Sequence, residues 1–392
     1  MKCIVHIGTE KTGTTYIQDC LYDNLKEFRR KRIYLSEMLG FPNNRHLVAY
    51  FEPDFKTNNW TRNNGISTAE EKEEFFYDFE NTFREEVRQA KQNSHTFIIT
   101  SEHFHSQLRD PKDIARFRDF LHSIFDEVKI VCFFREQYDT ALACYSTILK
   151  VGWSADRDEW IKKMCTLDNY YFNHMSIADQ WAEEFGRENC IYQLYDPKVD
   201  IWDKFLSILN IDNRLLKREK KTANLSLSTL QAEAFRIVNK KIPHHTSSAS
   251  MNRKRLKARS IILSSPEFEP GIIDSPKNQQ DIRDRFRERN EKFLEKYFPD
   301  VKEFPRRNRK PCPPTPEEYK AAYESFLENF IFTKMLEDVE GVNVGLLRDI
   351  ALGIRTTHPN FAFALMEQAS RFRPNGTKII KYLKDWSNET TN

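Results

Sequence analysis

The chain has 392 residues, of which 39% are apolar and 30% charged, so it can bury a core and is not compositionally disordered. Its formal net charge is only +3, which argues against a dedicated nucleic-acid-binding protein, since such proteins have a stronger basic bias. Its 7 cysteines are scattered without a C-x-x-C pair, which is typical of reduced thiols in a cytoplasmic protein. The opening residues do not read as a signal peptide, and no apolar run approaches the roughly 20 residues that span a membrane. We therefore expect a cytoplasmic protein without an integral membrane span.

Short apolar runs rich in β-branched and aromatic residues predict buried parallel strands. The three clearest are residues 3–7 (CIVHI), 96–100 (TFIIT) and 129–134 (KIVCFF), and residues 190–195 (CIYQLY) form a weaker fourth. Helical patterns alternate with them at about 14–28, 69–92, 111–125 and 138–150. This alternation predicts an α/β fold of three layers, in which helices cover both faces of a parallel sheet. Ligands of such sheets bind beyond the carboxyl ends of the strands.

From about residue 200 the pattern becomes helical, and it predicts a different organisation for the end of the chain. Helical patterns cover 200–209, 229–241 with Ser228 as its cap, and 278–297, whereas the polar, basic stretch 243–260 predicts a surface loop. Prolines at 305–316 predict a linker, because they cannot continue a helix. The remaining helical patterns are 317–330, 344–352, 360–371 and 378–386. We expect an α/β domain over 1–304, a linker over 305–316 and a helical appendage over 317–392.

A glycine-containing loop, GTEKTGTT, follows the first predicted strand and precedes a helix. Such a turn is a site for an anion, because free backbone N–H groups and the helix dipole both favour a phosphate there. An ATP-binding P-loop reads G-x-x-x-x-G-K-[ST], but here the lysine stands before the second glycine. The missing G-K-[ST] triplet, together with the lack of a clear acidic metal partner, favours a donor that needs no metal. The expected ligands are Gly8, Thr9, Glu10, Lys11, Thr12, Gly13, Thr14 and Thr15.

This loop resembles the 5′-phosphosulfate-binding loop of sulfotransferases that use 3′-phosphoadenosine-5′-phosphosulfate (PAPS), in which a lysine shortly precedes G-T-T. Residues 131–152 (VCFFREQYDTALACYSTILKVG) resemble that family's 3′-phosphate-binding unit, in which an Arg is followed by Ser and Tyr eight and ten positions later. Arg135 and Tyr145 match this pattern, but position 143 is Ala, and Ser146 is a candidate substitute. The resemblance extends over about residues 1–240 and implies a P-loop-like fold. Lys220, Lys221 and Asn224 resemble a further loop of bacterial members.

The resemblance implies roles for further residues. Lys11 is expected to stabilise the bridging oxygen that leaves in an in-line displacement at sulfur. The acceptor must lose a proton, and Glu102 is our first candidate for the base and His103 the second. Glu102, His105 and His46 are expected to line the acceptor site. Alternatives without a functional role stay open for four of these residues. In these alternatives His103 and His105 are ordinary packed or surface histidines, Lys11 is an exposed lysine of the turn, and Arg135 is a partner in a surface ion pair.

The sequence thus predicts a PAPS-dependent sulfotransferase that modifies a hydroxyl, of a carbohydrate, glycolipid or polysaccharide, without a metal. The expected partner is a glycan or glycolipid acceptor and not a nucleic acid. The C-terminal helices either contribute to a homodimer or cover the acceptor site, and both alternatives stay open. Two other functions also stay open: a Mg·ATP-dependent small-molecule kinase on a P-loop fold, and a non-catalytic protein that binds polyanions through its basic clusters.

Overall fold

The computed structural model describes residues 1–212, 216–218, 226–242, 253–264, 276–306, 342–356 and 359–389. The chain divides into two compact units. The first comprises Met1–Thr140, Cys165–Lys221 and Ile282–Arg307, and the second Ala141–Met164, Thr222–Asp281 and Asn308–Asn392. Because residues 307–341 are not described, the linker expected at 305–316 and its boundaries stay a prediction.

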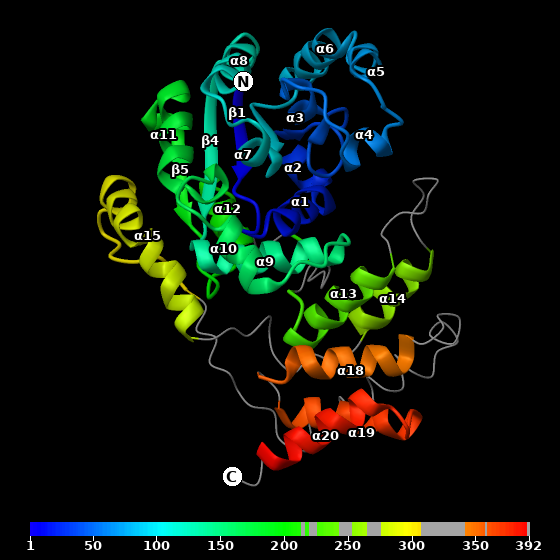
Figure 1. Ribbon diagram of the computed structural model, residues 1–392. Coiled ribbons are helices and arrows are strands. Elements are labelled where there is room, and N and C mark those ends of the chain that lie inside the picture. Colours follow the sequence, from blue (N-terminus) through cyan, green and yellow to red (C-terminus); the bar gives the residue numbers. More distant parts are fainter. Residues whose placement is uncertain are drawn as a thin grey trace. The chain divides into compact units, whose positions relative to one another are not determined.

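A parallel sheet of five strands forms the centre of the first unit, in the order β2-β3-β1-β4-β5 (Figure 1). The strands are β1 (Lys2–Gly8), β2 (Ile33–Leu35), β3 (Thr96–Thr100), β4 (Glu127–Phe134) and β5 (Cys190–Leu194). The four strands predicted from the apolar runs are confirmed. The sequence missed β2, because three residues are too few to show a pattern.

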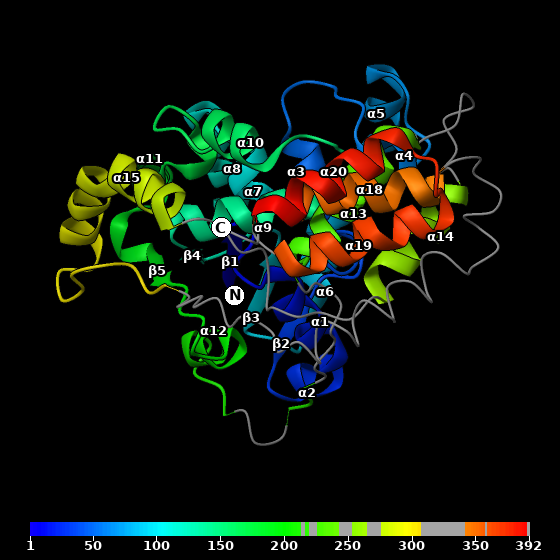
Figure 2. The same cartoon turned by 60° about the horizontal axis from the view of Figure 1, so that its bottom comes forward.

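Helices cover both faces of this sheet, because successive side chains of a strand point to opposite faces. One core contains Cys3, Val5 and Ile7 of β1, together with residues of α8 (Pro111–His122) and α11 (His174–Phe185). A second core contains Ile4 of β1, together with residues of α1 (Thr14–Asp23), α2 (Leu25–Arg30) and α12 (Ile201–Ile208). Figure 2 shows α1, α2 and α12 on one side of the strands and α8 and α11 on the other. The predicted α/β class with three layers is therefore confirmed. The helices whose residues lie mainly in this unit are α1 (Thr14–Asp23), α2 (Leu25–Arg30), α3 (Arg45–Phe51), α4 (Asn59–Asn63), α5 (Ala69–Phe75), α6 (Phe79–Lys91), α7 (His103–Gln107), α8 (Pro111–His122), α11 (His174–Phe185), α12 (Ile201–Ile208) and α15 (Pro276–Tyr297), with the short 3₁₀ turns η1 (Tyr170–Phe172) and η2 (Arg187–Asn189).

Two long helical patterns are each interrupted. The pattern at 14–28 forms α1 and α2, which meet at the buried Asn24. The Asn24 amide donates hydrogen bonds to the carbonyl oxygens of Cys20 (2.8 Å) and Lys217 (3.0 Å). The pattern at 69–92 likewise forms α5 and α6. Periodicity does not reveal the break at Asn24, because the bond to Lys217 comes from a distant part of the chain.

The second unit is helical in the residues that the structure describes, and α18 packs against both α13 and α19. Its described helices are α9 (Gln137–Lys150), which begins in the first unit, α10 (Arg157–Met164), α13 (Thr229–Lys241), α14 (Arg253–Ser264), α18 (Val342–Ile354), α19 (Pro359–Phe372) and α20 (Thr377–Glu389). The predicted helix at 229–241 is confirmed, with the Ser228 side chain accepting from the Gln231 N–H. Helices are also confirmed at 344–352, 360–371 and 378–386, whereas 317–330 lies outside the described residues.

The loop predicted at 243–260 was wrong for its second half, since α14 begins at Arg253. The Arg255 side chain is buried and donates hydrogen bonds to the carbonyl oxygens of Leu149 and Lys150. Lys, Arg, Leu and Ala favour helix even where no apolar periodicity is visible. Packing of Arg255 within its unit therefore orders a segment that looks like a polar loop.

Candidate anion-binding and active site

The predicted glycine loop lies at the carboxyl end of β1, where β3 and β4 also end. Two threonine hydroxyls stabilise the loop. The Thr9 hydroxyl donates to the Phe133 carbonyl oxygen (3.0 Å), and the Thr12 hydroxyl donates to the Thr9 carbonyl oxygen (2.6 Å). The Thr9 N–H also donates to the Phe133 oxygen (2.9 Å), which ties the loop to β4. The loop is thus held in place by its own hydroxyls and by the neighbouring strand.

Helix α1 begins directly after the loop, and its amino terminus is open to an anion. Gly13 precedes the helix with φ 85° in the left-handed region, where its lack of a Cβ is an advantage. Within the described chain, no side chain caps this terminus and no acidic residue lies in its first turn. The first N–H groups of a helix have no partner inside the helix, so those after Gly13 can bind a phosphate. Thr14 and Thr15 begin this helix, as the sequence predicts.

Arg135 follows β4 and is only 6% exposed. Its Nη1 donates to the Lys11 carbonyl oxygen (2.8 Å), and its Cζ lies 5.1 Å from the centre of the Tyr195 ring. Among the residues that the structure describes, its Nε and Nη2 have no hydrogen-bond partner. A buried cationic donor without a partner is costly, so two such N–H groups beside a phosphate-type loop point to an anionic ligand.

Two residues expected at the 3′-phosphate lie in the second unit: Tyr145, which the resemblance assigns there, and Ser146, the candidate substitute for the serine missing at position 143. The Tyr145 hydroxyl donates to the Ala155 carbonyl oxygen (3.0 Å), and burial raises the pKa of this phenol. The Ser146 hydroxyl oxygen accepts from the Leu227 N–H (3.0 Å). Their assignment to the donor stays a prediction. Lys220, Lys221 and Asn224 lie outside the described residues.

Glu102 lies against the end of β1, on the turn between β3 and α7. A Cβ placed on Gly8, whose φ is 111°, would lie 3.2 Å from the Glu102 Cα, so these two backbones approach closely. The Glu102 carboxylate accepts a 2.6 Å hydrogen bond from the Gln18 amide of α1. The structure thus brings Glu102 to the glycine loop and gives one of its oxygens a partner.

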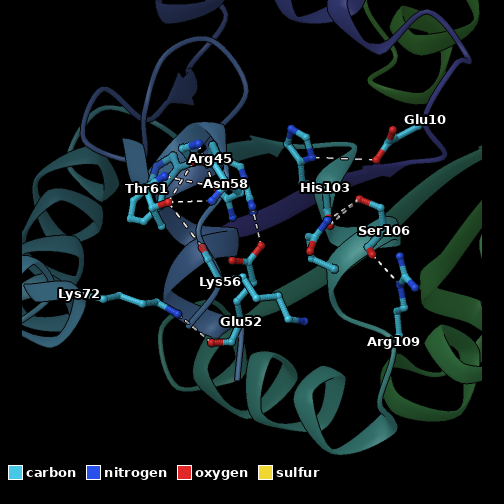
Figure 3. A network of polar contacts seen from close by, with 12 residues as sticks. Glu10, Arg45, Glu52, Lys56, Asn58, Thr61, Lys72, His103, Ser106 and Arg109 are labelled. Atoms are coloured by element: carbon cyan, nitrogen blue, oxygen red, sulfur yellow. Dashed lines mark hydrogen bonds and ion pairs between the residues drawn. The ribbon is translucent and has the colours of Figure 1, made fainter. Parts of the chain in front are cut away.

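Glu10 points from the loop toward α7, as Figure 3 shows. Its Oε1 lies 4.0 Å from the His103 Nδ1, and its Oε2 accepts a 3.1 Å hydrogen bond from the Tyr171 hydroxyl. Burial raises the pKa of Glu10, but nearby groups, with the charges of His103 and Lys11 foremost, outweigh it, so the pKa is lowered overall. Glu10 is therefore an anion at neutral pH.

Two of the predicted acceptor-site histidines occupy packed positions. His105 is fully buried, its Nε2 lies 3.3 Å from the Tyr171 carbonyl oxygen, and burial lowers its pKa to about 4. His46 packs its ring against Trp60 and Phe75, and its Nδ1 lies 3.1 Å from the Met38 carbonyl oxygen. None of these contacts of His46 involves the glycine loop. A role of either histidine toward an acceptor stays a prediction.

Three residues of this region were not singled out from the sequence. Gln18 lies one helical turn after Thr14 and therefore on the same helix face, so the helical spacing could have pointed to it. Tyr195 directly follows β5, and the rule that ligands bind beyond strand ends would have pointed to it. Tyr171 had no local signal, because 161 residues separate it from Glu10.

No group of three or more His, Cys, Asp or Glu residues in the described chain is placed to hold a metal ion. None of the described helices has the length and apolar character that crossing a membrane requires.

No family model matches the chain, and no curated protein matches it. Among solved structures, the crystal structure of a sulfotransferase from Alicyclobacillus acidocaldarius is similar, with 14% identity and a TM-score of 0.34, over 60% of this chain and 91% of that chain. Since identity and TM-score are both low, this likeness supports no conclusion about activity.

Proposed function

We propose that this protein transfers the sulfuryl group of PAPS to a hydroxyl of a carbohydrate, glycolipid or polysaccharide. The observation that carries the proposal is the buried Arg135, whose Nε and Nη2 have no partner in the described chain while its Nη1 binds the Lys11 carbonyl. A guanidinium can bind a phosphate with two parallel N–H groups, which suits the 3′-phosphate that distinguishes PAPS from ATP.

The glycine loop would hold the 5′ end of the donor. Backbone N–H groups at the start of α1 and the Lys11 ammonium both favour an anion there. PAPS supplies an activated sulfuryl group bound to a phosphate, which is the leaving group. Lys11 would stabilise the negative charge that develops on the oxygen between sulfur and phosphorus.

The turn after β3 would supply the base that accepts the proton of the acceptor hydroxyl. Glu102 and His103 are adjacent on this turn, and Glu102 lies against Gly8 at the start of the loop. Both residue types serve as general bases when they lie within hydrogen-bond reach of the hydroxyl. Glu102 is the first candidate from the sequence, and His103 is the second.

Calorimetry with adenosine 3′,5′-bisphosphate in EDTA, beside Mg·ATP and adenosine 5′-monophosphate, tests the donor class. We expect the bisphosphate to bind, the monophosphate to bind more weakly because it lacks the 3′-phosphate, and Mg·ATP not to bind. Binding of Mg·ATP alone would instead favour a small-molecule kinase. Binding of none of them, together with salt-sensitive binding of a polyanion such as heparin, would favour the non-catalytic alternative.

A further inference from the structure

Glu10 holds an unusual position for a residue of a phosphate-binding loop. A carboxylate beside a bound phosphosulfate is electrostatically unfavourable, so Glu10 needs a reason other than contact with the donor. Its side chain instead faces α7, where its Oε1 lies 4.0 Å from the His103 Nδ1 (Figure 3). The carboxylate therefore lies between the donor loop and the turn that would supply the base.

Two neighbours lie against the Glu10 carboxylate. The Tyr171 hydroxyl donates to its Oε2 at 3.1 Å, and the His103 Nδ1 lies 4.0 Å from its Oε1. Tyr171 is 161 residues away in the sequence, and His103 belongs to α7. Glu10 is therefore oriented by the fold and not only by its own loop.

The His103 ring is partly exposed, with 31% of its side chain accessible, whereas the Glu10 side chain is 21% accessible. A carboxylate on one side of an imidazole favours the tautomer with a proton on the facing nitrogen, and it stabilises the imidazolium that forms when the other nitrogen is protonated. With Nδ1 toward Glu10, the nitrogen left for a substrate is Nε2. Glu102, by contrast, already has one carboxylate oxygen bonded to the Gln18 amide.

We propose that His103 is the base of the transfer and that Glu10 is its positioning residue, which keeps the proton on Nδ1 and leaves Nε2 free. The inference rests on the proposed sulfuryl transfer. In the reacting step the acceptor hydroxyl gives its proton to the His103 Nε2 while its oxygen forms a bond to sulfur. The bond between sulfur and the 5′-phosphate oxygen breaks, its electron pair stays on that oxygen, and adenosine 3′,5′-bisphosphate leaves. Glu10 remains ionised throughout and touches neither reactant.

The first test reads the tautomer directly and needs no acceptor. ¹⁵N spectra of histidine-labelled full-length protein, with His103 assigned from the His103→Gln variant, are expected to show neutral His103 protonated on Nδ1. The Glu10→Ala variant is expected to shift His103 toward the Nε2-protonated form, which free imidazole side chains prefer. A wild-type His103 protonated on Nε2, or a Glu10→Ala spectrum identical to that of the wild type, would overturn the inference.

The second test is a double-mutant cycle on PAPS turnover, with water as the acceptor and release of adenosine 3′,5′-bisphosphate as the readout. We expect His103→Gln to lower kcat by about 100- to 10,000-fold, as loss of a general base does. Glu10→Gln should lower kcat by a smaller factor, roughly 10- to 100-fold, which is the range for loss of a partner behind a metal-bound histidine. Because the two residues act as a unit, Glu10→Gln should cause no further loss of kcat in the His103→Gln background. If Glu10 had a merely structural role, the factors by which the two substitutions lower kcat would multiply.

Two matched variants sharpen this cycle. Tyr171→Phe removes the hydrogen bond to Glu10 but leaves the charge of Glu10 in place. It should therefore lower kcat less than Glu10→Gln does, and an equal loss of kcat would overturn the inference. Glu102→Gln should retain more activity than His103→Gln. If instead Glu102→Gln is inactive and His103→Gln is active, the pairing of Glu10 and His103 is wrong and the sulfotransferase function stands. If the wild type neither binds the bisphosphate nor turns over PAPS, the function fails, and the ¹⁵N spectra alone decide whether Glu10 sets the tautomer.

Discussion

The Arg135 Nη1 donates a 2.8 Å hydrogen bond to the carbonyl oxygen of Lys11, across 124 residues of sequence. This bond joins the end of β4 to the glycine loop that follows β1. The strands β1 and β4 are neighbours in the sheet. It uses one of the guanidinium nitrogens, while Nε and Nη2 are left without a partner in the described part of the chain. The arrangement holds the loop and at the same time presents two donors to a ligand.

Replacement of Arg135 should weaken the binding of adenosine 3′,5′-bisphosphate. A hydrogen bond to a charged group contributes about 1.5–3 kcal/mol, so Arg135→Gln should weaken the affinity by about 10- to 100-fold. The preference for the bisphosphate over adenosine 5′-monophosphate should shrink as well. Calorimetry measures both, with Arg88→Gln as the control, since Arg88 is an exposed arginine of α6 paired with Glu85. An unchanged preference in Arg135→Gln would contradict its assignment to the 3′-phosphate.

Lys11→Ala should strongly lower the rate of transfer while the fold is kept. Removing one group that stabilises developing charge lowers kcat by about 100- to 1,000-fold. Lys11 has φ 67°, and alanine meets the same backbone demand as lysine there, so the loop itself should survive. The measurement is PAPS turnover beside thermal unfolding, with the exposed Lys26→Ala as the control. Full turnover by Lys11→Ala would refute the proposed role.

Gly13→Ala should destabilise the protein more than Gly65→Ala does. Both glycines have positive φ, 85° and 70°, so each substitution carries a backbone cost of about 1–2 kcal/mol. A Cβ at Gly13 would also lie 3.0 Å from the Ile201 Cγ2, whereas a Cβ at Gly65 meets nothing within 4 Å. Urea unfolding of the two variants separates contact from backbone strain. Equal losses in the free energy of unfolding would show that Ile201 of α12 moves away from the new methyl group at little cost.

Stability should decrease as the pH falls from about 6.5 toward 4. Burial lowers the pKa of His6 to about 3 and those of His105 and His174 to about 4, from an ordinary 6.5. Over this interval the unfolded chain binds protons that the folded chain does not, so the free energy of unfolding rises with pH. The slope is at most about 1.4 kcal/mol per pH unit for each histidine.

Urea unfolding at pH 7, 6, 5 and 4.5 measures this dependence. The His174→Gln variant removes one of the three groups, so its curve should be flatter than that of the wild type. His103→Gln is the control, since His103 is partly exposed. A wild-type stability that does not change over this range would contradict the burial of neutral histidines.

The sequence by itself predicted the elements whose causes are local. The continuous apolar runs of β1, β3 and β4 mark buried parallel strands, and Gly8 and Gly13 mark a glycine loop between the first strand and the first helix. The same runs place the loop, Glu102 and Arg135 at one sheet edge, because parallel strands end on the same side. The cap of α13 at Ser228 is likewise a local signal, and it was correct.

Only the tertiary structure decided what distant residues do to one another. Asn24 separates α1 from α2 through bonds that include Lys217, and Arg255 orders α14 through the carbonyls of Leu149 and Lys150. The orientation of Glu10 toward His103 depends on Tyr171, which no local pattern could connect with the loop. Sequence patterns report the burial and backbone preferences of neighbouring residues, whereas the direction of a polar side chain is set by partners that only folding brings into reach.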